Sequence, residues 1–404
     1  MSLGSGEPEL ILDLSRLLSR VLHATPTGVD RVEMAYARGL MARAPERLQF
    51  AAVHPSGVYG RLPAPAVRRF LDQTEGRWRN ERGVSRRLLR RSAARALWEL
   101  RPRRRAIGSA QGRAVYIQPS PNNLTDMRLI GSILRREGAR FVCMVHDLIP
   151  LQYPEYARPD GAAQHARRVD TIVTHASGIL CNSHATLAAL QPYLDRAGVR
   201  PATAVGHLGT ECGEAIATPA PGRPYFVCVG TIEPRKNHLL LLNLWRALSE
   251  RHGADAIPRL ILIGRRGWEN EQVVDMLERC PALRGCVEEH QGLPDRDVRQ
   301  LLAGARGLLL PSFAEGYGMP VSEALALRVP VLCSDLPALR EAGGDVPTFL
   351  DPLDGPGWER AILDLASAGS PIRTAQLARV AGWTPPGWQE HIAILLDLVH
   401  ELPR

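Results

Sequence analysis

The sequence lacks the features that hold a chain in a membrane or stabilise it with disulfides. Its 404 residues contain no run of about 18 apolar residues, the length that a helix needs to cross a bilayer. The N-terminal residues lack the apolar region of a secretory signal, so we expect a cytoplasmic protein. The seven cysteines are scattered without a C-x-x-C pair, which predicts reduced core residues and argues against a disulfide framework or a zinc site.

A pattern of metal ligands is also missing. Asp295 and Asp297 could suggest a metal pair, but they stand directly before the helical run VRQLLAGA. Acids in that position favour the start of a helix, so we predict no metal site.

Length and composition predict a globular protein of two domains, because 404 residues are too many for one core. The segment 211–223 (ECGEAIATPAPGR) is aperiodic and rich in proline, glycine and alanine, which is typical of a linker. We therefore expect an N-terminal domain over residues 1–215 and a C-terminal domain over 216–384. A last helix over residues 385–404 is expected to cross back to the N-terminal domain.

Apolar runs alternate with helical patterns along most of the chain. This alternation predicts an α/β fold in which parallel strands are covered by helices on both faces. Ligands of such sheets bind at the carboxyl ends of the strands. The expected strands are 10–12, 48–54, 114–118, 141–145, 178–181, 203–208, 225–229, 259–263, 308–310 and 329–333, and the expected helices are 27–43, 127–137, 162–175, 184–197 and 321–327.

Arginine is concentrated in residues 61–105, which hold 15 arginines against four acids, whereas the whole chain carries a net charge of +8. Residues 85–100 repeat apolar side chains at helical spacing among these arginines, which predicts a basic amphipathic helix. Such a helix suits an anionic membrane surface or an acidic partner. No nucleic-acid motif accompanies it, and a solvated arginine-rich face or a disordered loop remains an alternative.

The most informative stretch, residues 308–335, reads LLLPSFAEGYGMPVSEALALRVPVLCSD. It predicts a buried strand, a turn-rich loop, a short helix and a second buried strand. Glu315 lies in the loop and Glu323 in the first turn of the helix, so the two carboxylates can each accept bonds from a different hydroxyl group. A favourable interaction with the helix dipole is an alternative role for Glu323.

The loop between these two glutamates is rich in glycine, which lets the backbone approach a ligand closely. Amide groups at the start of the following helix form a ready site for an anion, and Pro320 suits the first helical turn. The loop and helix residues that we expect to contact a ligand are Gly316, Tyr317, Gly318, Met319 and Val321.

A second motif, Gly-Thr-Ile-Glu-Pro-Arg-Lys-Asn, follows the strand expected at residues 225–229. Gly230 and Thr231 begin the turn, and Arg235 and Lys236 bring two cations into one loop. A guanidinium fork and a compact ammonium together can neutralise a flexible diphosphate. The alternative is that both are ordinary surface cations.

Two further residues occupy positions where ligands bind in α/β folds. His146 directly follows the strand FVCMV, at its carboxyl end. Gly28 lies at the start of a helix that Thr25 or Thr27 could cap, where it could let a phosphate approach or could simply begin the helix.

Together the two motifs resemble those of family-4, GT-B-fold retaining glycosyltransferases (group 1), with the E-x7-E signature at Glu315 and Glu323. The resemblance is specific over residues 225–343, moderate over 141–210 and poor over 1–113. It implies two Rossmann-like doubly wound parallel-sheet domains that face a cleft. It also implies a nucleoside diphosphate sugar donor, a glycan or lipid-linked acceptor in polysaccharide assembly, and neither metal nor cofactor.

The resemblance also implies roles for individual residues. Arg235 and Lys236 would bind the diphosphate, Glu323 the ribose and Glu315 the transferred sugar. His146 would orient that sugar, and Gly28 corresponds to the glycine of the first domain. GDP-mannose or a deoxyhexose donor is our preferred guess.

Two other functions stay open. A sugar-nucleotide epimerase on the same fold would convert the donor without an acceptor, and a non-catalytic scaffold would bind a polyanion through the arginine-rich arm. A glycosidase is disfavoured, because both glutamates look committed to hydroxyl groups.

Overall fold

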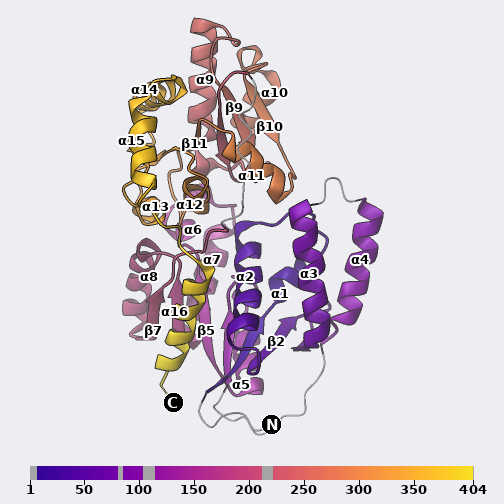
Figure 1. Ribbon diagram of the computed structural model, residues 1–404. Helices are drawn as coiled ribbons and strands as arrows, with labels where there is room; N and C mark the ends of the chain where they lie inside the picture. The colour runs from indigo at the N-terminus through magenta and orange to yellow at the C-terminus, as the bar shows by residue number, and fades with distance from the viewer. Residues whose placement is uncertain (1–6, 81–84, 103–113, 212–221, 404) are drawn as a thin grey trace. The chain divides into compact units, whose positions relative to one another are not determined.

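The computed structural model describes residues 7–80, 85–102, 114–211 and 222–403, and the structural statements below refer to these residues. The chain divides into two α/β units, labelled by element in Figure 1. The segment Gln152–Arg158 packs with unit 2 although its flanks lie in unit 1, which we did not predict. Unit 1 comprises Met1–Leu151, Pro159–Gly209 and Gly387–Arg404, and unit 2 comprises Gln152–Arg158 and Thr210–Pro386.

Unit 1 is built on a seven-stranded sheet with the strand order β3-β2-β1-β4-β5-β6-β7. Every neighbouring pair is parallel except β2 and β3, which form an antiparallel edge. The order changes direction at β1, and such a switch point is where α/β sheets bind ligands. The strands are β1 (Glu9–Asp13), β2 (Leu48–Val53), β3 (Tyr59–Leu62), β4 (Ala114–Gln118), β5 (Ala139–Val145), β6 (Ala176–Cys181) and β7 (Ala202–Val205).

Helices cover both faces of this sheet, which explains why its central strands are apolar on both sides. Ile11 and Phe141 face one core, and Met144, on the opposite face of β5, accepts a hydrogen bond from the Tyr36 hydroxyl. The helices of unit 1 are α1 (Ser15–Ser19), α2 (Gly28–Arg43), α3 (Ala64–Asn80), α4 (Arg86–Glu99), α5 (Met127–Glu137), α6 (Ile149–Gln152), α7 (Gly161–His175), α8 (His184–Ala197) and α16 (Trp388–Glu401).

The C-terminal helix α16 belongs to unit 1, where it packs beside α2 and β7 (Figure 1). A side chain at Gly39 of α2 would stand 2.5 Å from Ile392, so glycine permits this close packing. His391 is buried, and its Nδ1 lies 3.0 Å from the carbonyl oxygens of Gly206 and His207. These contacts close unit 1 with a segment far away in sequence.

Unit 2 has a six-stranded parallel sheet with the order β10-β9-β8-β11-β12-β13. Phe226, Leu262 and Leu309 pack on one face against Trp245 and Trp358 of two covering helices. Its strands are β8 (Tyr225–Val229), β9 (Arg259–Ile263), β10 (Val287–His290), β11 (Gly307–Leu310), β12 (Val331–Ser334) and β13 (Thr348–Leu350). Its α-helices are α9 (His238–His252), α10 (Glu271–Arg279), α11 (Asp295–Ala303), α12 (Met319–Ala326), α13 (Pro337–Gly343), α14 (Gly355–Ala366) and α15 (Pro371–Val380), and its 3-10 turns are Pro154–Tyr156, Pro234–Lys236 and Pro281–Leu283.

Some predicted boundaries were wrong. Strand β7 ends at Val205, whereas we expected it to reach residue 208, and β12 begins at Val331, after Pro330, which has no N–H to donate to the sheet. The predictions missed the strands β3, β10 and β13, which are only three or four residues long, and the helix α3, in which arginines obscure the apolar periodicity. Residues 81–84 and 103–105 of the arginine-rich arm and 212–221 of the linker lie outside the described residues.

No helix in the described ranges is long and apolar enough to cross a membrane.

Candidate functional site

Strands β8 and β11 are neighbours in the sheet of unit 2, so the loops at their carboxyl ends lie side by side. Gly264, at the end of β9, lets the first loop fold closely, because a side chain there would stand 1.8 Å from the carbonyl oxygen of Gly230. The backbone of the two loops is joined where Phe313 donates to the Arg235 carbonyl at 2.7 Å. The sequence motifs therefore meet in one place.

The meeting point is a cluster of paired charges. Lys236 Nζ donates to Glu315 Oε1 at 2.5 Å, and Arg235 Nη1 donates to Glu315 Oε2 at 2.9 Å. Ser312 also donates to Glu315, at 2.7 Å, and Arg235 Nε lies 2.6 Å from a carboxylate oxygen of Glu233. Two cations thus face two carboxylates, and the cluster is balanced without a ligand.

These neighbours determine the protonation state of Glu315. Burial alone would raise the pKa of its carboxyl, but the charges of Lys236 and Arg235 and the hydrogen bonds outweigh burial and hold the pKa at about 2. The group is therefore ionised near neutral pH. It can accept hydrogen bonds from hydroxyl groups, but it cannot act as a general acid.

The glycine-rich loop leads into helix α12 through Gly318, which adopts a φ of +104°. A side chain there would also lie 2.3 Å from Leu339, so both conformation and space require glycine. One predicted amide is not available to a ligand: the Val321 N–H donates to the Gly318 carbonyl at 2.9 Å, because it already belongs to the first turn. The amides of Gly318 and Met319 are still predicted to bind an anion.

The other predicted residues of this segment lie around the same loops. Glu323 is half-buried on α12, Tyr317 is buried, and Gly316 and Thr231 are partly exposed. Gly230 has a φ of +149° beside the Lys236 side chain. The donor-binding residues predicted for the C-terminal domain thus all lie in unit 2.

Sequence reasoning missed several members of this site. Glu233 and Ser312 contact Arg235 and Glu315, yet neither stands out as a motif. An aromatic stack also adjoins the cluster, with the ring centroids of Tyr156 and Phe313 5.6 Å apart and nearly parallel. Tyr156 comes from Gln152–Arg158, a segment whose place in unit 2 only the fold reveals.

One signal in the composition could have strengthened the prediction. Lys236 is the single lysine of the chain, against 49 arginines. This one lysine lies in the cluster and is only 7% exposed. Its presence in a chain that otherwise uses arginine indicates that the site needs a compact ammonium group.

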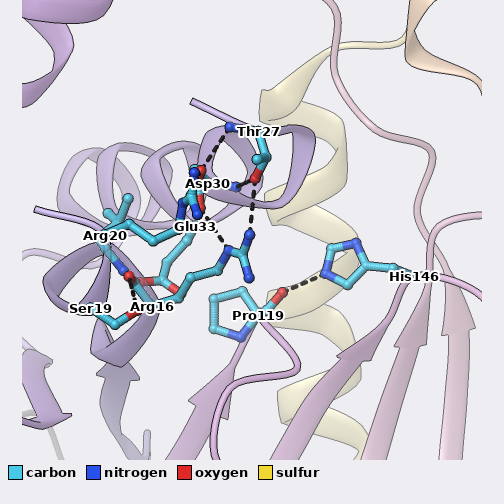
Figure 2. Close-up of polar contacts among 9 residues, drawn as sticks. Arg16, Ser19, Arg20, Thr27, Asp30, Glu33, Pro119 and His146 are labelled. Carbon is cyan, nitrogen blue, oxygen red and sulfur yellow. Dashed lines mark hydrogen bonds and ion pairs between the residues drawn. The ribbon is translucent and has the colours of Figure 1, made fainter. Parts of the chain in front are cut away.

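The remaining predicted residues lie in unit 1. His146 follows β5, and its Nε2 lies 2.7 Å from the Pro119 carbonyl (Figure 2). Burial lowers the pKa of His146, with a further contribution from the charge of Arg16, so the ring is neutral near pH 7. Because a carbonyl can only accept, we assign the proton to Nε2, and Nδ1 is then an acceptor for a hydroxyl group.

Gly28 is the first residue of α2 and follows the helix cap. Thr27 and Asp30 form a capping box, in which the Asp30 amide donates to the Thr27 hydroxyl at 3.4 Å and the Thr27 amide to the Asp30 carboxylate at 2.7 Å. The structure thus gives Gly28 a place in the helix start, and donor binding by Gly28 stays a prediction.

Beside this cap lie two arginines that sequence reasoning missed. Arg16 and Arg20 both bind Asp30, each at 2.7 Å, and Arg16 also donates to the Thr27 hydroxyl (Figure 2). Behind them Glu33 is fully buried, with the Leu17 amide donating to it at 2.9 Å. Burial and the nearby Asp13 raise the pKa of Glu33 to about 8, so it is mainly neutral at pH 7.

The predicted catalytic residues thus divide between the units, with His146 in unit 1 and the other three in unit 2. Within the part of the chain that the structure describes, no three His, Cys, Asp or Glu side chains are grouped so that they could hold a metal ion. Asp295 and Asp297 lie in the first turn of α11, where the cap is Pro294 and not an aspartate.

Comparison with known proteins identifies the segment around the cluster. Residues 223–368 match the protein family described as "Glycosyl transferases group 1". The chain is 39% identical over 130 residues to O-antigen chain mannosyltransferase B of Escherichia coli, a match that covers 32% of this chain and 33% of that protein. It is 27% identical over 226 residues to the serotype-specific mannosyltransferase WbdA of Escherichia coli, which covers 52% of this chain and 27% of that protein. The chain therefore spans only about a quarter to a third of these relatives.

Solved structures resemble the chain over almost its whole length. WaaG, a glycosyltransferase involved in lipopolysaccharide biosynthesis, aligns with a TM-score of 0.62 at 15% identity, covering 97% of this chain and all of that one. HepE of Anabaena, in complex with UDP and glucose, gives the same TM-score, identity and coverage. These similarities confirm the predicted fold class, two Rossmann-like α/β domains with parallel sheets.

Proposed function

We propose that this protein transfers a hexose from a nucleoside diphosphate sugar to a saccharide acceptor, because residues 223–368 match the group 1 glycosyl transferase family and the chain has the GT-B fold. The observation that carries the proposal is the cluster of Arg235, Lys236 and Glu315, at the carboxyl ends of two neighbouring strands. It offers one buried and one partly exposed cation for a diphosphate, and an ionised carboxylate for sugar hydroxyls.

In this proposal the donor diphosphate binds Arg235 and Lys236 and the amides of Gly318 and Met319. The diphosphate shares these cations with Glu315, and the hydrogen bond from the Ser312 hydroxyl keeps the Glu315 carboxylate in place. Glu323 accepts hydrogen bonds from the ribose hydroxyls. Glu315 accepts hydrogen bonds from the transferred sugar, a role that fits a group unable to donate a proton.

The reaction exchanges one bond at the anomeric carbon for another with retention. The bond from this carbon to the diphosphate oxygen breaks, and the negative charge that develops on the diphosphate is stabilised by Arg235 and Lys236. The acceptor hydroxyl attacks from the same face and forms the new glycosidic bond, while its proton passes to the departing diphosphate. His146, neutral with Nδ1 as acceptor, orients a sugar hydroxyl. Neither metal nor cofactor takes part in this scheme.

We propose mannose as the transferred sugar and GDP-mannose as the donor. The support is the similarity to O-antigen mannosyltransferases, and it suggests a growing polysaccharide as the acceptor. A UDP-linked glucose is the alternative, because the structure of HepE holds UDP and glucose.

The single lysine gives a direct test of the donor site. An amine-specific reagent can modify only Lys236 and the N-terminal amine, so a nucleoside diphosphate bound at Lys236 should protect one of two sites. A thermal-shift screen of nucleoside diphosphate sugars then identifies the donor, because a ligand at 100 times its Kd adds about 2.7 kcal/mol of stability. If no nucleotide protects Lys236, the proposed site is wrong.

Product analysis distinguishes the other functions. Conversion of the donor sugar without any acceptor would identify an epimerase. A scaffold would keep its binding activity when Lys236 and Glu315 are both replaced.

We further propose that unit 1 binds the inner surface of the membrane through helix α4. We expected the apolar residues of this helix, Leu89 among them, to face the membrane, but Leu89 and Ala93 are buried against the protein. Leu88 and Trp98 remain exposed, at 61% and 64%. Helical spacing places Trp98 on the same stripe as two exposed arginines.

The exposed stripe of α4, made of Arg87, Leu88, Arg91 and Trp98, combines cations with apolar side chains, as interfacial helices do. Replacing Arg87 and Arg91 with serine should reduce binding to anionic vesicles about 30-fold, at about 1 kcal/mol for each residue. Replacing Arg246 and Arg360 in unit 2, which are also exposed, should have no effect. Equal binding of all variants, or equal binding to neutral vesicles in co-sedimentation, would exclude this surface.

A further inference from the structure

Four aromatic side chains, those of Tyr153, Tyr156, Trp268 and Phe313, gather at the loops of unit 2. None of the four lies in an α-helix or a strand, and all are partly or largely exposed. Tyr153, at 39%, is the most exposed aromatic side chain among the described residues of this unit. Only 5% of the chain is aromatic, and large apolar rings are normally buried, so this group at the surface indicates a ligand.

Three of these rings form a stack. The ring centroids of Tyr153 and Tyr156 are 5.9 Å apart, with an angle of 30° between the ring planes. The centroids of Tyr156 and Phe313 are 5.6 Å apart, with an angle of 9°. Tyr156 takes part in both contacts, so Tyr153 and Phe313 are the ends of the stack. Because the Tyr153 ring is partly open to solvent, a further ring can pack against it.

The backbone that carries the two tyrosines is fixed to unit 2. The Tyr156 amide donates to the Tyr153 carbonyl at 3.0 Å, and Trp268 Nε1 donates to the Tyr156 carbonyl at 3.1 Å. The Arg158 guanidinium lies over the Trp268 ring, 4.9 Å from its centroid. A surface that is already held in place loses little conformational freedom when a ligand binds, which favours affinity.

The Phe313 end of the stack is joined to the proposed donor site. The Phe313 amide donates to the Arg235 carbonyl, and Arg235 Nη1 donates both to the Ala314 carbonyl and to Glu315, each at 2.9 Å. The stack thus adjoins the carboxylate that we assign to the transferred sugar. Glu323, which we assign to the ribose, lies on helix α12 instead. This position favours a sugar ring over the nucleotide base as the partner of the stack.

We infer that the stack of Tyr153, Tyr156 and Phe313 binds a sugar ring of the acceptor saccharide. The C–H groups on one face of a pyranose carry partial positive charge, which matches the negative face of an aromatic ring. The hydroxyl of Tyr153 can donate to or accept from a sugar hydroxyl at the rim. The inference rests on the proposed function for the identity of the saccharide as an acceptor, whereas the stack is a feature of unit 2 alone.

NMR titration of mannotriose and of maltotriose with the full-length protein tests this surface. Tyr153→Ala should bind the better of the two sugars about three- to tenfold more weakly than the wild type, because one aromatic contact is lost. Tyr153→Phe keeps the ring and should bind within about twofold of the wild type. The matched control is Leu363→Ala, which removes an apolar side chain of the same exposure, 39%, from helix α14 and should bind normally.

Two results of this titration would overturn the inference. One is that the wild type binds neither sugar, and the other is that Tyr153→Ala and Leu363→Ala bind with equal affinity.

Two further measurements separate sugar binding from other roles of the stack. Tyr153→Ala should bind bare GDP and UDP as well as the wild type does. Weaker binding of either nucleotide would mean that the stack holds the base of the donor, which contradicts the inference. If Tyr153 only fastens residues 152–158 to unit 2, Tyr153→Ala should lower the melting temperature and bind both sugars normally, and that result would also contradict it.

Failure of the proposed function would look different. In the transfer reaction Tyr153→Ala should raise the acceptor KM by about the same three- to tenfold and change kcat little. If sugar binding depends on Tyr153 but no sugar is transferred, the aromatic site stands and the transferase proposal falls. If a nucleotide protects Lys236 and sugar is transferred while Tyr153→Ala keeps the acceptor KM of the wild type, only the aromatic site falls.

Discussion

The two units differ in how their buried charged side chains are paired. In unit 2 the cations Arg235 and Lys236 are neutralised by Glu233 and Glu315, at distances of 2.5–2.9 Å. In unit 1 the Nε of Arg168 is buried without a hydrogen-bond partner among the described residues. Because the charges of the cluster in unit 2 are paired, a bound anion can take the place of a carboxylate as the partner of these cations.

A pair of buried glutamates shows the same contrast. Glu315 lies between two cations, and its pKa is held at about 2, whereas burial and the nearby Asp13 raise the pKa of Glu33 to about 8. The residue type and the burial are alike, so the neighbours determine the difference. A buried carboxyl can thus be a fixed negative charge in one unit and a neutral hydrogen-bonding group in the other.

The largest effect is expected from Lys236→Ala. This change removes the ammonium that would neutralise the departing diphosphate and leaves Glu315 with only one cation. Turnover at saturating donor should fall by about 100-fold or more, because this charge matters most in the transition state. Steady-state kinetics with the identified donor measure this, and near-normal turnover would remove Lys236 from the reaction.

The matched control for this prediction is Lys236→Arg. It keeps the positive charge but replaces a compact ammonium with a planar fork, and it makes the chain free of lysine. We expect nucleotide binding to survive better than turnover. Full turnover by this variant would mean that charge alone matters and that the single lysine has no special role.

A smaller effect, about tenfold on nucleotide binding, is expected from Glu323→Gln, since one charge-assisted hydrogen bond to the ribose is weakened.

Glu315→Gln should instead bind the bare nucleoside diphosphate as well as the wild type or better, because Arg235 and Lys236 lose their internal partner. Its transfer activity should still fall. Calorimetry with the bare nucleotide separates the two variants, and equal weakening in both would contradict this division of roles.

The sequence predicted the four central strands of unit 2, β9, β8, β11 and β12, because local signals coincide there, but it missed the short edge strands β10 and β13. Residues 225–229 and 259–263 are apolar runs that end in glycine, and they became β8 and β9 without change. The motifs at Arg235 and Glu315 lie at the ends of neighbouring parallel strands, so the fold class alone predicts that they meet.

The charge cluster of unit 1 could not be predicted in the same way. Arg16 and Glu33 stand in ordinary helical sequence, and only the packing of α1 against α2 brings these two helices together, with the Leu17 amide donating to Glu33. Their protonation and pairing depend on burial, which no local pattern encodes. The amide of Val321 shows a different kind of error. From the sequence it was predicted to be free for an anion, but in the structure it donates to the Gly318 carbonyl within the first turn of the helix.

The last prediction concerns the pH dependence of stability, and the variant that tests it, Glu33→Gln, should leave donor binding unchanged. The folded pKa of Glu33, about 8, lies above its ordinary value of 4.5, so between these values the unfolded chain releases a proton that the folded chain keeps. The free energy of unfolding should therefore fall as pH rises through this range, by at most about 1.4 kcal/mol per pH unit. Glu33→Gln cannot ionise and should flatten this slope, measured by urea unfolding between about pH 5 and pH 8.

Glu315→Gln is the control for that measurement, and it completes the comparison between the units. The folded pKa of Glu315 is below its ordinary value, so its contribution to stability is complete above about pH 5 and is lost only in stronger acid. This variant should therefore keep the wild-type slope between about pH 5 and pH 8. If Glu33→Gln keeps the wild-type slope, Glu33 is already ionised in the folded protein over this pH range, and burial does not raise its pKa as we expect.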